Sequence, residues 1–311
     1  MSVGLPYKGS KSEIAEELVA KLPPCNKILD ACCGGGAVLV TLAQSLKYKS
    51  VVGNDINPAT IKLLDAVLIN KGQIEYEHPE PCSRVDFLNS IQRIKNDDFN
   101  IQDCVNKYCA SFGNEGKTYL YGESIEEYKL IAEQMLTAKT LSRRREYYRK
   151  FFSIVTDSEN DDDGRLQKLE FVQRLQSLEH LERLERLERL ERLERLERLE
   201  RLECLDLFDI DYSEFDIVYF DIPYINTSGY DYGFDHEKFY DLFSSLKIPA
   251  FLSEYKAPFT VVAEFDKTSI FSNNSKKINA LEKLYFNGSV EQYKELMGLY
   301  YEQKETQLSL F

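Results

Sequence analysis

The stretch NKILDACCGGGAVLVTLAQSL, residues 26–46, constrains the fold more than any other part of the chain. An apolar strand ends in a run of glycines, and an amphipathic helix follows. Glycines let the backbone approach a ligand closely, and the first turn of the helix presents free amides. Asp30, Gly34 and Gly36 give the pattern D-x-x-x-G-x-G. The segment therefore predicts a strand–turn–helix unit of an α/β protein with a ligand at the turn.

The next strand leads to a second acid. In SVVGNDINPATIKLLDAVL, residues 50–68, this strand ends at Asn54-Asp55, Ile56 follows, and Pro58 lies near the first turn of the next helix. An acid at this place can accept two hydrogen bonds from ribose hydroxyls, or it can simply cap the helix. A dinucleotide site has a similar pattern. An acid that precedes the glycines, as Asp30 does, is more typical of a methyl-donor site.

Two further segments carry candidate site residues. LPYKGSKSEIAEEL, residues 5–18, places Tyr7 and Lys11 around a glycine turn. A ring and a cation there can cover an adenosine and pair with a carboxylate, or they can belong to an ordinary loop. Farther on, FDIVYFDIPYINTSG, residues 215–229, predicts a buried strand that Pro223 ends. Because burying a charge is costly, we expect Asp221 at the exit of this strand, facing a cleft.

The order of these motifs resembles the Dam-like class of N6-adenine-specific DNA methyltransferases. The motifs are Tyr-x-Gly-x-Lys, D-x-x-x-G-x-G, N-D-x-N, D-Y and D-I-P-Y, and the resemblance covers about residues 4–75 and 205–290. It implies an α/β fold with a mostly parallel Rossmann-like methyltransferase sheet and helices on both faces. It also implies S-adenosyl-L-methionine as methyl donor and adenine in double-stranded DNA as acceptor.

The resemblance assigns roles to the tetrapeptide Asp221-Ile222-Pro223-Tyr224, which is similar to the D-P-P-Y of the family. A carboxylate and the carbonyl of Ile222 would accept the two hydrogens of the adenine amine. Pro223 would keep these acceptors fixed, and Tyr224 would stack on the flipped-out base. Isoleucine stands where the family usually has its first proline, but a carbonyl is still available there.

The same resemblance implies the cofactor site. Asp211 would accept from the adenine amine of the cofactor and Tyr212 would pack beside it, unless the pair merely ends a surface strand. Cys32 stands where the family usually has a phenylalanine, which reduces the apolar cover. The expected cofactor-binding residues are Tyr7, Lys11, Asp30, Cys32, Gly34, Gly36, Asp55, Ile56, Asp211, Tyr212 and Asp221.

The middle of the chain predicts a helical insertion domain. We expect the methyltransferase domain over residues 1–85 and 205–311 and a target-recognition domain over residues 86–164. A glycine-punctuated loop and a basic helical stretch suggest DNA contacts by Asn114, Lys117, Tyr119, Arg143, Arg144, Arg145 and Arg149. A solvated basic face is the alternative. The net charge of −13 weakens long-range attraction to DNA without excluding a local basic surface.

The Leu-Glu-Arg triplets between Leu181 and Arg201 form the most repetitive segment. Each residue type favours a helix, and each Glu has an Arg four positions later. The three-residue period does not match 3.6 residues per turn, so the leucines wind around the helix. The repeat predicts a helical spacer over residues 165–204 without chemistry of its own.

The last residues, QLSLF, resemble the short peptide with which bacterial proteins dock on the DNA polymerase sliding clamp. Gln307 would make the polar contact, and Leu308, Leu310 and Phe311 would fill a hydrophobic groove; these side chains can instead pack on the protein itself.

The irregular spacing of the cysteines argues against a disulfide framework and a zinc site, so no metal is expected. The start of the chain lacks the pattern of a signal peptide, and we expect a cytoplasmic enzyme, bacterial or phage-encoded, of the kind found in restriction–modification systems. Three alternatives remain: methylation of adenine in RNA, methylation of a protein glutamine, or a catalytically silent DNA- or clamp-binding protein.

Overall fold

A computed structural model of the chain describes residues 3–76, 79–156, 181–193, 196–224, 234–270 and 277–298. The chain divides into two compact units. Unit 1 comprises Met1–Gly4, Gly9–Leu64 and Arg195–Phe311, and unit 2 comprises Leu5–Lys8 and Asp65–Glu194. The helical insertion therefore carries a short piece of the amino-terminal segment with it. No helix within the described ranges is long and apolar enough to cross a membrane.

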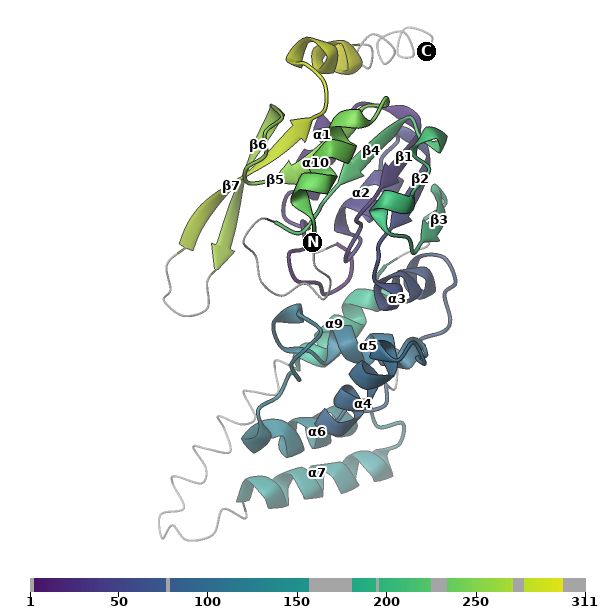
Figure 1. The fold of residues 1–311 in the computed structure, drawn as a ribbon. Coiled ribbons are helices and arrows are strands. Elements are labelled where there is room, and N and C mark those ends of the chain that lie inside the picture. The colour runs from purple at the N-terminus through teal and green to yellow at the C-terminus, as the bar shows by residue number, and fades with distance from the viewer. Residues whose placement is uncertain are drawn as a thin grey trace, which may run out of the picture. The chain divides into compact units, whose positions relative to one another are not determined.

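Unit 1 contains a seven-stranded sheet in the order β3-β2-β1-β4-β5-β7-β6 (Figure 1). Strands β3, β2, β1, β4 and β5 pair in parallel, whereas β7 runs antiparallel to both β5 and β6. The predicted mostly parallel α/β sheet is thus confirmed. The strands are β1 Cys25–Asp30, β2 Tyr48–Asn54, β3 Leu199–Glu203, β4 Ile217–Phe220, β5 Ala250–Glu254, β6 Thr260–Ile270 and β7 Lys277–Phe286.

Helices connect the parallel strands and cover the sheet. The chain passes from β1 to β2 through α2 (Ala37–Gln44) and from β4 to β5 through α10 (His236–Ser245), moving across the sheet in opposite directions. Right-handed crossovers therefore place α2 and α10 on opposite faces. In Figure 1, α10 lies in front of the strands. Unit 1 also contains α1 (Ala15–Lys21), the start of α3 (Pro58–Leu68) and helical residues 290–298.

The largest side chains of the α10 face form one core. Phe220 of β4 packs edge-on against Phe239 and Phe243 of α10, with ring centroids 5.2 and 6.0 Å apart. Leu29 and Val218 belong to the same buried cluster.

The direction of the strand order reverses between β1 and β4, and ligands of open α/β sheets bind outside the carboxyl ends of the strands at such a point. A ligand site is therefore expected at the carboxyl ends of β1 and β4.

The end of the Leu-Glu-Arg repeat forms the edge strand β3, so the helical spacer predicted over residues 165–204 is wrong for this segment. Leu199 lies opposite Val51, whereas Arg201 lies opposite Val52, so the intervening residue is a bulge. The bulge shifts the alternation of side chains by one and puts Leu199 and Leu202 on the same face. A three-residue repeat is thereby accommodated in a structure with a two-residue period.

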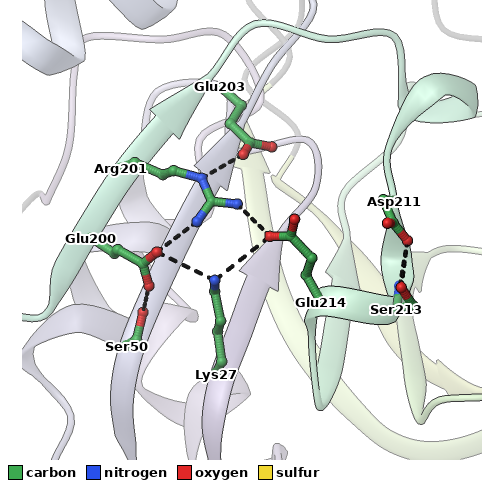
Figure 2. A network of polar contacts seen from close by, with 8 residues as sticks. All are labelled: Lys27, Ser50, Glu200, Arg201, Glu203, Asp211, Ser213 and Glu214. Atoms are coloured by element: carbon green, nitrogen blue, oxygen red, sulfur yellow. Dashed lines mark hydrogen bonds and ion pairs between the residues drawn. The ribbon is translucent and has the colours of Figure 1, made fainter.

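Arg201 joins this edge strand to its neighbours through exposed ion pairs (Figure 2). Its guanidinium donates to Glu200 at 2.6 Å, to Glu203 at 2.6 Å and to Glu214 at 2.8 Å. Lys27 of β1 donates to Glu200 at 3.3 Å. Exposed ion pairs contribute little individually, so this network mainly selects the position of β3 beside β2.

Unit 2 is helical over most of its described residues. Its helices are α4 Arg84–Lys95, α5 Ile101–Cys109, α6 Glu123–Thr137, α7 Leu141–Thr156 and α9 Glu182–Glu191, with the short 3₁₀ turn η1 at Phe112–Asn114. Ser83 and Asn100 begin α4 and α5 with reciprocal capping boxes. One buried cluster includes Phe87, Tyr119 and Tyr121.

The first triplets of the repeat are part of the unit 2 core. The guanidinium of Arg183 donates to Glu133 Oε2 at 2.7 Å and to the carbonyl of Glu80 at 2.6 Å, and its side chain is 1% exposed. Glu133 also accepts from the hydroxyl of Tyr121 at 2.9 Å. Farther along α9, the side chain of Arg192 is 72% exposed. Identical triplets therefore occupy different environments, and α9 packs within a unit rather than separating two domains.

Candidate functional site

Acidic residues gather at the carboxyl ends of the central strands of unit 1. Asp30 ends β1, Asp55 follows β2, Asp221 follows β4 and Glu254 ends β5. Parallel strands bring their carboxyl ends to one edge of the sheet, as the sequence motifs require. Asn54 joins neighbouring connections there, because its side-chain amide donates to the carbonyl of Ala31 at 3.0 Å and to that of Leu205 at 3.1 Å.

The turn after β1 uses backbone conformations that favour glycine. Gly34 and Gly36 have φ angles of +47° and +76°. A Cβ atom on Gly36 would lie 2.8 Å from Cδ2 of Leu64. The backbone amide of Gly34 donates to Asp55 Oδ2 at 2.9 Å, and the amide of Asn57 donates to Oδ1 at 2.8 Å. The carboxylate of Asp55 therefore supports the turn directly.

The helix after β2 is capped by Asn57 rather than by Asp55. The amide of Ala59 donates to Asn57 Oδ1 at 3.1 Å, and α3 begins at Pro58 as predicted. Ile56, beside Asp55, is among the exposed large apolar residues. An acid bonded at the glycine turn and an exposed apolar side chain next to it provide a polar and an apolar contact for a nucleoside.

Asp30 is a buried acid whose carboxylate makes at most a weak contact with the backbone of Cys32 among the described residues. It is 1% exposed, and neither carboxylate oxygen meets the geometry of a hydrogen bond. Burial, and then the charges of Asp221 and Asp55, raise the pKa of Asp30 well above its usual range. An unpaired acceptor of this kind is costly unless a ligand supplies a donor or a positive charge. The glycine turn and Asp30 therefore fit a cationic cofactor.

Lys11 connects the amino-terminal segment to the end of β4. Its ammonium lies 2.7 Å from Asp221 Oδ1 and 2.6 Å from Glu282 Oε1, and it donates to the hydroxyl of Tyr224. The same hydroxyl donates to Glu282 Oε1 at 2.8 Å. Burial disfavours the charged form of Lys11, but the two carboxylates outweigh it and raise the pKa of Lys11 above its usual value. We call Lys11, Asp221, Tyr224 and Glu282 the lysine cluster.

Aromatic and backbone contacts hold the tetrapeptide after β4. The ring of Tyr224 packs edge-on against Tyr255, with centroids 4.6 Å apart. The carbonyl of Pro223 lies 2.8 Å from Nε2 of His236, and because a carbonyl can only accept, His236 is the donor. Ile222 is buried in the α10 core. The contact of Tyr255 agrees with its position directly after a buried run in the sequence, whereas His236 is a contact that the motif pattern did not identify.

Asp211 and Tyr212 differ in their environment: Asp211 is exposed and caps a turn, whereas the ring of Tyr212 packs on the core. The exposed carboxylate of Asp211 accepts from the amide and the hydroxyl of Ser213 at 3.0 and 2.6 Å and caps the turn η4, Tyr212–Glu214 (Figure 2). Tyr212 packs against Phe220, with ring centroids 5.8 Å apart. The hydroxyl of Tyr212 donates to the carbonyl of Leu207 at 2.6 Å, and burial is the main cause that raises the pKa of this hydroxyl.

Asp206 is an acid at the end of the β3 connection that sequence reasoning missed. Burial is the largest cause of the raised pKa of Cys32, and the charge of Asp206 adds to that of the acids after β1, β2 and β4. Asp206 also caps the turn η3, Leu207–Asp209, by accepting from the amide of Phe208 at 3.0 Å. Its position three residues after β3 was the signal that could have identified it. That signal was missed because the residues of β3 were assigned to the helical spacer.

Tyr7 and the insertion residues belong to unit 2. Tyr7 stacks on Tyr108 with centroids 5.9 Å apart. Tyr119 is buried, and its hydroxyl donates to the carbonyl of Cys82 at 2.7 Å, which removes it from the candidate DNA-contacting set. Lys117 is exposed and Asn114 is half-buried. Arg143, Arg144, Arg145 and Arg149 are all exposed along α7.

Comparison with known families identifies the chain. Residues 7–189, more than half of its length, match the family model of D12 class N6 adenine-specific DNA methyltransferases. The chain belongs to this family. The matched range contains the glycine turn, Asp55 and most of unit 2, and it ends before the lysine cluster is complete. No curated protein matches the chain.

Membership of the D12 class family gives the general activity. Enzymes of this family transfer a methyl group from S-adenosyl-L-methionine to N6 of adenine in DNA, and the chain is a DNA adenine methyltransferase by family. The resemblance predicted from the motifs is therefore confirmed.

Proposed function

We propose that the chain methylates N6 of an adenine that is flipped out of double-stranded DNA, with the lysine cluster as its active centre. The observation that carries the proposal is the position of Asp221. The side chain of Asp221 follows a central strand and is 23% exposed, and it shares Lys11 with the hydroxyl of Tyr224. A partly open carboxylate next to an aromatic ring suits an amino group on a planar base.

The glycine turn and its surroundings fit S-adenosyl-L-methionine. Asp30 would face its positive charge, and Gly34 and Gly36 would let the backbone approach it. Asp55 would accept from its ribose hydroxyls. Asp211, or Asp206 three residues after β3, would accept from its adenine amine. When bound, this cofactor supplies an electrophilic methyl group on a sulfonium.

The tetrapeptide after β4 would prepare the acceptor. The amine of adenine is a weak nucleophile because its lone pair is delocalised into the ring. Asp221 and the carbonyl of Ile222 would accept its two hydrogens and so draw the nitrogen toward tetrahedral geometry. Tyr224 would stack on the base, and the bond from His236 to Pro223 keeps the turn in place. Much of the acceleration would come from this fixed orientation.

The exposed basic face of α7 is the proposed DNA contact in unit 2. Arg143, Arg144, Arg145 and Arg149 are exposed there, together with Lys150, which pairs with Glu146 at 2.9 Å. Guanidinium groups bind phosphate oxygens in a bidentate manner and resist neutralisation. A helix face with several of them compensates locally for the overall charge of −13.

Transfer of a radiolabelled methyl group tests the proposed function. The full chain is incubated with labelled S-adenosyl-L-methionine and with duplex DNA, structured RNA or protein, and the methylated base is identified by mass spectrometry. We expect label in N6-methyladenine of duplex DNA and its loss in Asp221→Ala. Label in RNA or protein alone, or equal transfer by the variant, would contradict the proposal. Such an outcome would favour the alternative acceptors or a silent binding protein.

Docking on a DNA polymerase sliding clamp is a separate proposal. It depends on the sequence QLSLF alone, because Gln307, Leu308, Leu310 and Phe311 lie outside the described residues. Deletion of residues 307–311 should abolish retention on an immobilised bacterial clamp while methylation of free duplex DNA is unchanged. Equal retention of both forms would end the idea.

A further inference from the structure

Glu282 holds the ammonium of Lys11 at the same distance as Asp221 does. The separations are 2.6 Å to Glu282 Oε1 and 2.7 Å to Asp221 Oδ1. The two acids differ in their access to solvent: the side chain of Glu282 is 0% exposed and that of Asp221 is 23% exposed. One lysine is therefore shared between a buried acid on β7 and a partly open acid after β4.

The cost of burial decides which acid keeps the lysine when both compete for it. A carboxylate without access to water needs a charged partner, since removing one member of a buried pair is strongly destabilising. Asp221 can exchange Lys11 for water or for a substrate amine, whereas Glu282, at 0% exposure, cannot exchange it for water. Separation of Lys11 from Asp221 is consequently cheaper than its separation from Glu282.

Glu282 also controls the ring that would stack on the base. Its Oε1 accepts from the hydroxyl of Tyr224 at 2.8 Å. The backbone of Glu282 is fixed by the antiparallel ladder, in which it lies opposite Phe265 of β6. A rigid strand thus positions, through one carboxylate, both the cation beside Asp221 and the aromatic ring of Tyr224.

We propose that Glu282 is a positioning residue of the methyl transfer, which retains Lys11 so that Asp221 becomes available to the adenine amine. This inference rests on the proposed function. In the free protein Lys11 bridges the two acids. When the amine arrives, Lys11 stays with Glu282, and Asp221 accepts the amine in place of the ammonium. Glu282 itself does not touch the substrate.

The charged surroundings of Asp221 define a pH test. The titratable groups that interact with it are Lys11 from the amino-terminal segment, Asp30 at the end of β1, Cys32 after β1, Tyr219 of β4, Tyr224, Tyr255 after β5 and Glu282 of β7. Replacing Glu282 by glutamine removes a negative neighbour and leaves Lys11 to Asp221 alone. Both changes favour the ionised form of Asp221, so the acid limb of the rate profile should move to lower pH.

The experiment compares Glu282→Gln with Glu264→Gln in the full chain, on duplex DNA. Glu264 lies on the neighbouring strand β6, is half exposed and pairs with Lys283 at 3.1 Å, so it controls for loss of an acid from this part of the sheet. We expect kcat to fall at least tenfold in E282Q, with an unchanged Kd for S-adenosyl-L-methionine and a shifted acid limb. E264Q should behave as the wild type does. Glu282→Asp, which keeps the charge, should lose less activity than E282Q.

A double variant separates positioning from simple loss of structure. If Glu282 acts through Lys11, E282Q should have little further effect on kcat in a Lys11→Met background. Equal kcat values and acid limbs for E282Q and E264Q, or additive losses in K11M/E282Q, would overturn the role of Glu282 while the methyltransferase activity stands. An inactive wild-type protein would instead overturn the proposed function, and this inference with it.

Discussion

The repeat offers the same substitution in two environments. Arg183 in the first turn of α9 and Arg192 at its carboxyl-terminal cap belong to identical Leu-Glu-Arg triplets, but the side chain of Arg183 is 1% exposed and that of Arg192 is 72% exposed. Arg183→Leu leaves the buried carboxylate of Glu133 without its cation, which should lower the free energy of unfolding by about 3–5 kcal/mol. Arg192→Leu removes only an exposed pair with Glu188 and should cost about 0.5 kcal/mol.

Urea denaturation of the full chain, followed by circular dichroism, measures the difference. With a slope of about 2 kcal/mol per molar urea, Arg183→Leu should lower the midpoint of the unit 2 transition by about 1.5–2.5 M, and Arg192→Leu by less than about 0.5 M. The double variant Arg183→Leu/Glu133→Leu should recover most of the loss, since an apolar pair replaces the buried ion pair. Equal shifts for the two arginine variants would refute this account of the repeat.

Three further predictions concern the cofactor site and the basic helix. Because the pKa of Asp30 is raised in the folded protein, its contribution to stability is complete below the unfolded pKa of about 4 and is lost as pH rises through the raised value. Asp30→Asn should therefore raise the urea midpoint at pH 8 and flatten the pH dependence of that midpoint. It should also weaken the binding of S-adenosyl-L-methionine measured by calorimetry. An unchanged pH dependence of the midpoint would contradict a raised pKa of Asp30. Gly36→Ala should cost about 1–2 kcal/mol of unfolding free energy because φ is +76° there, whereas Gly122→Ala, with no atom within 4 Å of the new Cβ, should cost less, and equal midpoints would contradict this. Replacing Arg143, Arg144 and Arg145 by glutamine should reduce the salt dependence of duplex binding, log K against log[salt], by about 3 in slope, and Arg192→Gln serves as the control; an unchanged slope would place the DNA contact elsewhere.

Local patterns predicted the parts of the fold in which chain geometry dominates. The run of apolar residues before Asp30, the glycines with positive φ and the proline at the start of α3 each constrain the backbone within a few residues. The exit of Asp221 from a buried strand follows from the cost of burying its charge. These elements needed no knowledge of distant contacts, and the sheet and site edge followed from them.

The features that the sequence did not predict depend on contacts between residues that are far apart in the chain. Glu282 lies on an antiparallel strand near the end of the chain, and only the sheet brings it to Lys11. Tyr119 reads as an exposed loop aromatic, but the cluster with Phe87 and Tyr121 buries it. Strand β3 has a helix-favouring sequence, and pairing with β2 overrides that propensity. Asp206 was missed for the same reason.

The copies of the Leu-Glu-Arg tripeptide are chemically identical, so their own sequence does not assign one copy to a helix and another to a strand. The triplets at Leu181–Arg183 supply a buried cation to a helix, and those around Leu199 supply the edge of a sheet, yet any copy could serve at either place. When DNA replication slips by nine nucleotides, the gene loses or gains a triplet without a change of reading frame, and every buried position still receives the residue it requires. Such an event changes only the length of the chain between α9 and β3. The connection between the two units can therefore vary among descendants in steps of three residues.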